Sequence, residues 1–138
     1  MPPAAIEYSE RRDLPIEGIV RLYRANGWSS AEKPTELRNA LHHSHTLLSA
    51  WAGEELVGLG NAISDGYLVV YYPHLLVHPD LQGQGIGTEL MKRLMDKYQG
   101  FHQQMLVADG RAIEFYRRSG FSRAGKTEPM WIYAGRDH

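Results

Sequence analysis

Three glycines at alternate positions, Gly83, Gly85 and Gly87, mark the stretch of this sequence best suited to hold a ligand. Because glycine has no Cβ, its backbone can adopt positive φ angles and approach a ligand with the N–H groups turned inward. An apolar run typical of a strand precedes them, and Thr88 opens an apolar-periodic helix. The first turn of a helix favours a phosphate or pyrophosphate. The stretch therefore predicts an anion-binding loop, the alternative being a connection that only turns the chain.

Two common phosphate-binding motifs do not fit these residues. A P-loop ends in Gly-Lys-Ser/Thr, whereas Gly87-Thr88 has no lysine. A dinucleotide fingerprint places its third glycine three residues after the second, where Thr88 stands here. Neither an NTP-binding nor a dinucleotide-binding fold is therefore predicted.

The segment from Gln82 to Gly87 does resemble the Gln/Arg-x-x-Gly-x-Gly/Ala signature of the GCN5-related N-acetyltransferases, the GNAT family. In that family the loop holds the pyrophosphate of acetyl-CoA, and the strand before it pairs with the pantetheine arm. The resemblance thus implies acetyl-CoA as cosubstrate. The cofactor-binding residues that it implies are Leu75, Leu76, Val77, Gln82, Gly83, Gln84, Gly85, Ile86, Gly87 and Thr88.

A second stretch, residues 109–121, is similar to the family's Asn-x-x-Ala-x-x-Phe-Tyr-x-Lys/Arg-x-Gly-Phe segment. There the tyrosine returns a proton to the leaving thiolate, so the resemblance implies a catalytic Tyr116. A phenol with a pKa near 10 can donate to a thiolate whose conjugate acid lies at about 8.5 to 9.5. The alternative is an aromatic residue on a buried helix face, and both roles can hold together. Asp109 replaces the commoner Asn and either contacts the cofactor or caps its helix.

The general base stays open on sequence alone. Gln104 occupies the place where family members that acetylate protein N-termini carry a glutamate base, and glutamine cannot take a proton. The candidates are Asp65 at a strand end, His74 beside an expected divergence of strands, or a series of waters leading to bulk solvent.

The acceptor is predicted only as a primary amine, with a small molecule slightly favoured over a peptide lysine. Four aromatic residues could line a pocket for a small amine such as an arylalkylamine, or could be ordinary core and strand residues: Trp28, Tyr67, Tyr71 and Tyr72. The predicted reaction is direct attack of the amine on the thioester, which needs no cysteine nucleophile. A non-catalytic acyl-CoA-binding or regulatory module is the competing class.

Composition limits which other classes of protein are expected. The 138 residues predict one domain over 1–138, with a formal net charge of -1 that gives no general attraction to nucleic acid. The absence of cysteine, of a long apolar run and of a basic, apolar leader predicts a cytoplasmic protein without a membrane partner. His42, His43 and His45 lack the spacing of a metal site, so no metal is expected. A homodimer is a family-level possibility.

Hydrophobic periodicity predicts the elements that position these residues. A proline that interrupts the fourth strand, Pro73, predicts a bulge or kink there. Strands are expected at 6–8, 46–52, 56–64, 67–72, 75–77, 104–107 and 130–133, and helices at 15–26, from 34, from 88 to 100 and at 111–119. These elements, with the resemblance, predict an α/β (α+β) GNAT-like acyl-CoA N-acyltransferase fold. Its sheet is mixed and mostly antiparallel, with about six to seven strands, about four helices and splayed central strands.

Overall fold

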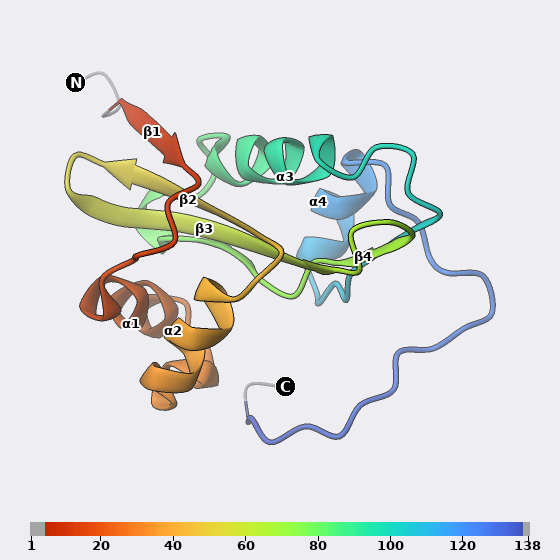
Figure 1. Ribbon diagram of the computed structural model, residues 1–138, viewed down its shortest axis with the longest axis horizontal. Helices are drawn as coiled ribbons and strands as arrows, with labels where there is room; N and C mark the ends of the chain where they lie inside the picture. Colours follow the sequence, from red (N-terminus) through yellow and green to blue (C-terminus); the bar gives the residue numbers. More distant parts are fainter. Residues whose placement is uncertain (1–4, 137–138) are drawn as a thin grey trace.

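A mixed six-stranded sheet with helices on both faces forms the body of the protein (Figure 1). The computed structural model describes residues 5–136. The elements in sequence order are β1 Ile6–Ser9, α1 Ile16–Ala25, the 3-10 turn η1 Ser29–Glu32, α2 Pro34–His42, β2 Thr46–Ala52, β3 Glu55–Ser64, β4 Val69–Tyr71, β5 Leu75–Val77, the 3-10 turn η2 Pro79–Leu81, α3 Ile86–Asp96, β6 Gln103–Met105 and α4 Ala112–Arg118. The six strands and four α-helices of this described part of the chain confirm the predicted fold class.

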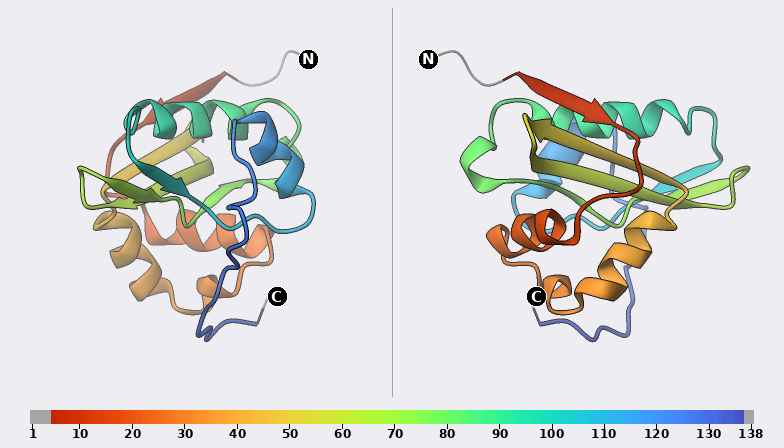
Figure 2. Two further views of the ribbon diagram at one scale, coloured as in Figure 1. Left: turned by 90° about the vertical axis from the view of Figure 1, so that its right-hand side faces the viewer. Right: turned by 60° about the vertical axis from the view of Figure 1, so that its left-hand side comes forward.

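Near one end of the sheet, the two strands β4 and β5 share one edge of β3. The path is β1-β2-β3-β4-β6, and β5 pairs with β3 on the same edge as β4. Every pairing is antiparallel except that of β4 with β6. Figure 2 shows α1 and α2 below the sheet and α3 above it.

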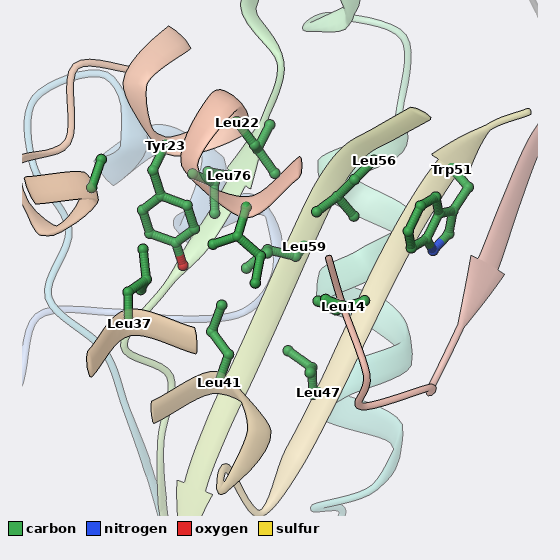
Figure 3. Close-up of a cluster of buried hydrophobic side chains, with 12 residues drawn as sticks. Leu14, Leu22, Tyr23, Leu37, Leu41, Leu47, Trp51, Leu56, Leu59 and Leu76 are labelled. Atoms are coloured by element: carbon green, nitrogen blue, oxygen red, sulfur yellow. The ribbon is translucent and has the colours of Figure 1, made fainter. Parts of the chain in front are cut away.

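Each face of the sheet has its own hydrophobic cluster. Under α1 and α2, Leu22, Leu41 and Leu59 are among the buried side chains (Figure 3). Under α3, Leu90 and Leu94 pack on β2 and β3. Burying a leucine side chain stabilises the folded state by about 2 kcal/mol. The apolar faces of the helices therefore fix the two layers on the sheet.

Between β4 and β5 there is one residue too many for regular pairing. Tyr71 pairs with Ile63, and Leu75 pairs with Gly60. Three residues, 72 to 74, therefore oppose only two on β3, 61 and 62, which defines a β-bulge. The bulge confirms the interruption predicted at Pro73.

Several predicted boundaries were wrong. Helix α3 begins at Ile86 instead of Thr88, because Gly85 already turns the backbone with φ 87° and its C=O accepts the first helical hydrogen bond, from Glu89 N–H. Residues 130–133 form no strand, since the segment is exposed and does not run beside a sheet edge. The strand at 104–107 is instead Gln103–Met105. These differences arise where tertiary neighbours, and not local propensity, decide the structure.

Close packing of α3 on the sheet depends on Gly60. A Cβ at this position would lie 2.8 Å from Leu94 Cδ1 and 2.9 Å from Leu75 Cδ1. Gly60→Ala should therefore lower the free energy of unfolding by about 1–3 kcal/mol through overpacking. Gly18→Ala is the control, because its Cβ would meet Leu56 at an ordinary 3.6 Å inside α1. Urea denaturation measures both, and equal stability of the two variants would contradict this packing.

Candidate active site

Strand β5 has one edge that no other strand of residues 5–136 occupies. Two hydrogen bonds show which residues of β5 and β3 are hydrogen-bonded pairs. His78 N–H donates to Val57 O, and Asn61 N–H donates to His74 O. Hydrogen-bonded and non-hydrogen-bonded pairs alternate between these two positions. In that alternation, Leu75 and Val77 lie opposite Gly60 and Gly58 at non-hydrogen-bonded positions. Their N–H and C=O groups therefore point away from β3, toward the side where β6 would continue.

Strand β6 leaves β5 open because it ends too early. Its last pair is Met105 with Tyr71, followed by one further hydrogen bond from Tyr72 N–H to Met105 O (3.0 Å). Beyond the bulge, β6 no longer follows β5. The two strands therefore diverge as predicted, and the outward N–H groups of Leu75 and Val77 and the C=O of Leu75 can pair with an extended, amide-bearing ligand, whereas Val77 O accepts from Gln82 Nε2.

Asn61 builds the bulge, and the sequence reasoning missed it. Asn61 is buried, with 4% of its surface exposed. Its side-chain Oδ1 accepts a hydrogen bond from His74 N–H (3.0 Å), which in a regular ladder would go to the backbone C=O of Asn61. Its Nδ2 donates to Ser44 Oγ (3.0 Å). An asparagine inside an otherwise apolar strand was the available signal, because asparagine is depleted in strands.

The glycine loop directly follows β5 and leads into α3. Gly83 and Gly85 have φ angles of 82° and 87°, whereas Gly87 lies inside the helix with no positive φ, contrary to expectation. The helix starts without a side-chain cap, so the N–H groups of Ile86, Gly87 and Thr88 have no acceptor within it. These donors and the helix dipole point into the loop and suit an anion.

Gln82 and Gly87 hold the loop in place. Gln82 Nε2 donates to Val77 O (3.0 Å) and to Asn26 Oδ1 (3.2 Å), which ties the loop to β5 and to the end of α1. A Cβ on Gly87 would touch Phe115 at 3.6 Å and Val77 at 3.7 Å. These are ordinary contact distances, and they show that β5, α3 and α4 meet beside Gly87. The contacts of the predicted residues with a cofactor stay predictions.

Tyr116 lies half-buried on α4, next to Phe115. Burial raises the pKa of Tyr116 to about 12, because the charged phenolate is poorly solvated there. The side chain is therefore a protonated hydrogen-bond donor at neutral pH. Its ring packs edge-on against Phe121 at 6.1 Å, so Tyr116 has a packing role, and its catalytic role stays a prediction.

Asp109 is not the N-cap residue of α4. That residue is Arg111, whose own side chain makes no capping hydrogen bond. Instead, the backbone C=O groups of Asp109 and Gly110 accept from Ala112 and Ile113 N–H, at 3.0 and 3.3 Å. Gly110, with φ 53°, places this turn before the helix, so the interpretation of Asp109 as the cap was wrong.

The structure separates the two side chains that are candidates for the proton acceptor, Asp65 and His74, and gives Gln104 a different partner. Asp65 lies in the exposed β3–β4 turn, where hydrogen bonds from the N–H groups of Leu68, Tyr67 and Val69 lower its pKa. Gln104 accepts a hydrogen bond from Tyr72 Oη (2.7 Å) and so has a structural partner. His74 lies in the bulge, beside the open edge of β5, with its Nδ1 2.7 Å from Tyr23 Oη.

The four aromatic residues do not form one pocket. Tyr72 is buried on the α3 side of the sheet and packs on Tyr98 and Phe121. Tyr67 and Tyr71 are exposed on and before β4. Of the four, Trp28 is the one whose ring contacts His74, with the two ring centroids 5.3 Å apart. Trp28 therefore stays a candidate for the acceptor side of the site.

The three neighbouring histidines point to different partners. His43 Nδ1 lies 2.8 Å from Asn39 O, and His45 Nδ1 lies 2.7 Å from Tyr98 Oη. In residues 5–136 no group of three side chains is placed to hold a metal ion. No helix in that part of the protein is long and apolar enough to cross a bilayer.

Comparison with known proteins places the chain in a family. The model of the acetyltransferase (GNAT) domain matches residues 11–129. The structure superposes with a TM-score of 0.81 on a GNAT family acetyltransferase from Streptococcus pneumoniae, with 30% identity over 94% of this chain and 99% of that one. For a protein from Deinococcus radiodurans described as a putative acetyltransferase, the TM-score is 0.82 and the identity 25%, over 95% and 90% of the two chains. The chain belongs to the GNAT acetyltransferase family.

The curated relatives extend beyond the part that this chain matches. An uncharacterized N-acetyltransferase ycf52-like of Prochlorococcus marinus is 27% identical over 83% of this chain and 67% of its own length. Serotonin N-acetyltransferase 2, chloroplastic, of Oryza sativa is 33% identical over 62% of this chain and 46% of its own length. The cytoplasmic location of this chain stays a prediction.

The role assigned to Asn61 can be tested without a ligand. Asn61→Leu leaves His74 N–H without its acceptor, so backbone amides at 72–77 should exchange faster in deuterium-exchange mass spectrometry. The control is Ser49→Ala, a buried serine on β2 that accepts from Trp51 Nε1 (2.8 Å). Both variants should lose about 1–3 kcal/mol of stability. Unchanged exchange at 72–77 in Asn61→Leu would contradict the role.

Proposed function

We propose that this chain transfers an acetyl group from acetyl-CoA to a primary amine by direct attack. The observation that carries the proposal is that two surfaces with hydrogen-bond donors adjoin each other, namely the outer edge of β5 and the glycine loop. The outward backbone groups of Leu75 and Val77 lead directly to the loop at Gly83 and Gly85 and to the uncapped start of α3. An extended arm with amides and a diphosphate at its end, as in CoA, matches these two surfaces in order.

In the proposed reaction, the neutral amine nitrogen attacks the thioester carbonyl carbon. The C–N bond forms, the carbonyl oxygen becomes an oxyanion, and the C–S bond then breaks to release the thiolate. Outward N–H groups on β5, near Val77, would stabilise the oxyanion. The nitrogen loses one proton and the sulfur gains one, so no acyl-enzyme is needed.

Tyr116 is proposed as the hydrogen-bond donor to the departing sulfur. With a pKa of about 12, it is a weaker acid than a thiol at about 8.5. Full proton transfer from Tyr116 to a free thiolate is therefore uphill. We expected a closer match between the pKa values of the phenol and the thiol, because an unperturbed phenol has a pKa near 10. The contribution of Tyr116 is a hydrogen bond that stabilises the negative charge developing on sulfur as the C–S bond breaks.

His74 is proposed as the group that takes the proton from the amine. Burial raises the pKa of Tyr23 well above its usual value, so this phenol stays protonated beside His74 Nδ1. Donation from Nδ1–H to Tyr23 Oη leaves the lone pair of His74 on Nε2, as a base requires, whereas donation from Tyr23 O–H to Nδ1 leaves a proton on Nε2. The proposed base has the first arrangement. The exposed Asp65 already accepts three backbone N–H groups and is the weaker candidate.

A small primary amine is proposed as the acceptor, with a peptide lysine as the alternative. The ring of Trp28 beside His74 offers an apolar wall for an aromatic amine. The relatives' names divide on this point, since one is a serotonin N-acetyltransferase of rice and another a histone acetyltransferase TAP1 of soybean. A panel of arylalkylamines, polyamines and lysine peptides decides between them.

Replacing Tyr116 with phenylalanine tests both the activity and the role of the phenol. Because the protein has no cysteine, release of CoA thiol can be followed with a thiol reagent without protein background. The kcat with the best amine should fall on the order of 10²-fold, while acetyl-CoA still binds.

The pH dependence gives a sharper check of Tyr116. Burial disfavours the phenolate, so the phenol persists beyond its unperturbed range and deprotonates only near the raised pKa of about 12. The ratio of parent to Tyr116→Phe activity should therefore stay constant from about pH 7 to about pH 10. If the ratio already declines at a pH below about 10, Tyr116 is an ordinary, solvated phenol. No turnover by the parent with any amine would favour the non-catalytic module.

His74→Gln separates the proposed base from its alternatives. We expect kcat/KM to fall on the order of 10²-fold and the acidic limb of its pH profile to disappear. Asp65→Asn is the matched control and should retain activity within about twofold, because the turn lies away from the bulge. An unchanged acidic limb in His74→Gln would assign the proton to water or to another group.

A further inference from the structure

A buried polar contact joins the end of α2 to the strand that carries Asn61. Ser44, two residues beyond α2, is 5% exposed, and its Oγ accepts a hydrogen bond from Asn61 Nδ2 at 3.0 Å. The contact lies on the α1 and α2 face of the sheet, because alternate residues of a strand share a face and Leu59 packs there (Figure 3). Polar side chains in such an apolar layer are stable only when they are hydrogen-bonded, so the direction of each hydrogen bond matters.

The end of α2 fixes the direction of the Ser44 hydroxyl. Ser44 N–H donates to Leu41 O (3.2 Å), so it does not serve Ala40 O as it would in a continuing helix. Ser44 Oγ donates to Ala40 O instead, at 2.9 Å. Because a hydroxyl has one hydrogen to give, Ser44 Oγ can meet Asn61 only as an acceptor.

Arg12 holds this turn in place from the surface. Its Nη1 donates to His42 O (2.9 Å) and to Ser44 O, and its Nη2 donates to His45 O (3.0 Å). One guanidinium therefore binds three carbonyl groups at the end of α2, where a cation also suits the helix dipole. The position of Ser44 is thus fixed by contacts other than the one with Asn61.

Ser44 decides which way the Asn61 amide points. With Nδ2 on Ser44 Oγ, the Oδ1 atom of Asn61 faces His74 N–H and accepts from it at 3.0 Å. In the reversed amide, Nδ2 would face the N–H of His74, so two donors would meet. Oδ1 would then require the hydrogen that Ser44 gives to Ala40 O. Only the observed direction satisfies all three hydrogen bonds.

We propose that Ser44 is a positioning residue of the acetyl-transfer site, which acts through Asn61 to hold the bulge that carries His74 and opens the edge of β5. The inference rests on the proposed function. Without Ser44 Oγ, Asn61 Nδ2 loses its acceptor, the amide can reverse, and His74 N–H loses this hydrogen bond. The bulge would shift beside the reacting carbonyl, while the glycine loop that would hold the diphosphate stays in place.

Steady-state kinetics with acetyl-CoA and the best amine test this role. Ser44→Ala should lower kcat on the order of tenfold, because a small displacement of reacting groups has a large effect on the rate. The KM for acetyl-CoA should stay within about twofold of the parent value, since the glycine loop is unchanged.

Ser49→Ala is the matched control. Ser49 is also a buried serine whose Oγ donates to a backbone carbonyl, Ser9 O (3.2 Å), and accepts from a side-chain N–H, Trp51 Nε1 (2.8 Å). Its contacts lie on β1 and β2, away from the bulge. This variant should keep both kcat and KM within about twofold of the parent values.

A double variant shows whether Ser44 acts through Asn61. Once Asn61→Leu has removed the amide, Ser44 has no amide direction left to fix. The kcat of the variant with both Ser44→Ala and Asn61→Leu should therefore equal that of Asn61→Leu within about twofold. Independent roles of the two residues would instead make the two losses of kcat multiply.

Amide exchange of His74, followed by NMR, tests the same contact without acetyl-CoA or an amine. The rate is divided by that of the slowest amides of β3, so that a general loss of stability cancels. This ratio should rise at least about tenfold in Ser44→Ala and should stay at the parent value in Ser49→Ala.

Three results would overturn the proposal. They are a kcat of Ser44→Ala equal to that of the parent, losses of kcat that multiply in the double variant, and an unchanged exchange ratio of His74 in Ser44→Ala. A parent protein without turnover would contradict the proposed function instead. The exchange ratio alone would then decide whether Ser44 holds the bulge.

Discussion

One extra residue between β4 and β5 determines the geometry of the site. Because three residues oppose two on β3, the backbone cannot continue as a single regular strand. The Asn61 side chain stabilises this irregularity by accepting the N–H of His74, which would otherwise have no partner in the ladder. Once the strand is offset, β6 cannot follow it past Tyr72. The outward N–H groups of β5 and the C=O of Leu75 thereby become available to a ligand, while Val77 O is held by Gln82.

The second constraint is the close approach of α3 to the sheet. Gly58 and Gly60 on β3 leave room for Leu90 and Leu94, and Phe115 lies beside Gly87. This packing puts the start of α3 directly after β5, so its uncapped N–H groups continue the open edge of the strand. The same contact brings Phe115, and with it Tyr116, to the side of the loop. Backbone groups thus supply most of the proposed binding surface, and few side chains carry chemistry.

Much of this arrangement was predictable from local sequence. Pro73 predicts the bulge because it cannot donate to a ladder, and Gly83 and Gly85 do adopt the positive φ angles that the loop requires. Tertiary contacts decide the rest. Gly87 lies inside the helix without a positive φ angle, and burial makes Tyr116 a weaker acid than its type predicts. Residues 130–133 have strand propensity, but a strand exists only where a neighbour pairs with it.

The central claim is that the loop and the β5 edge bind acetyl-CoA, and titration calorimetry tests it most directly. The parent protein should bind acetyl-CoA, and Gly85→Glu should weaken binding at least about tenfold, since it places a carboxylate where the diphosphate would lie. Gly53→Glu adds the same charge and the same backbone strain, at φ 62° in the β2–β3 turn, and should bind like the parent. No binding by the parent, or equal binding by Gly85→Glu, would contradict the account.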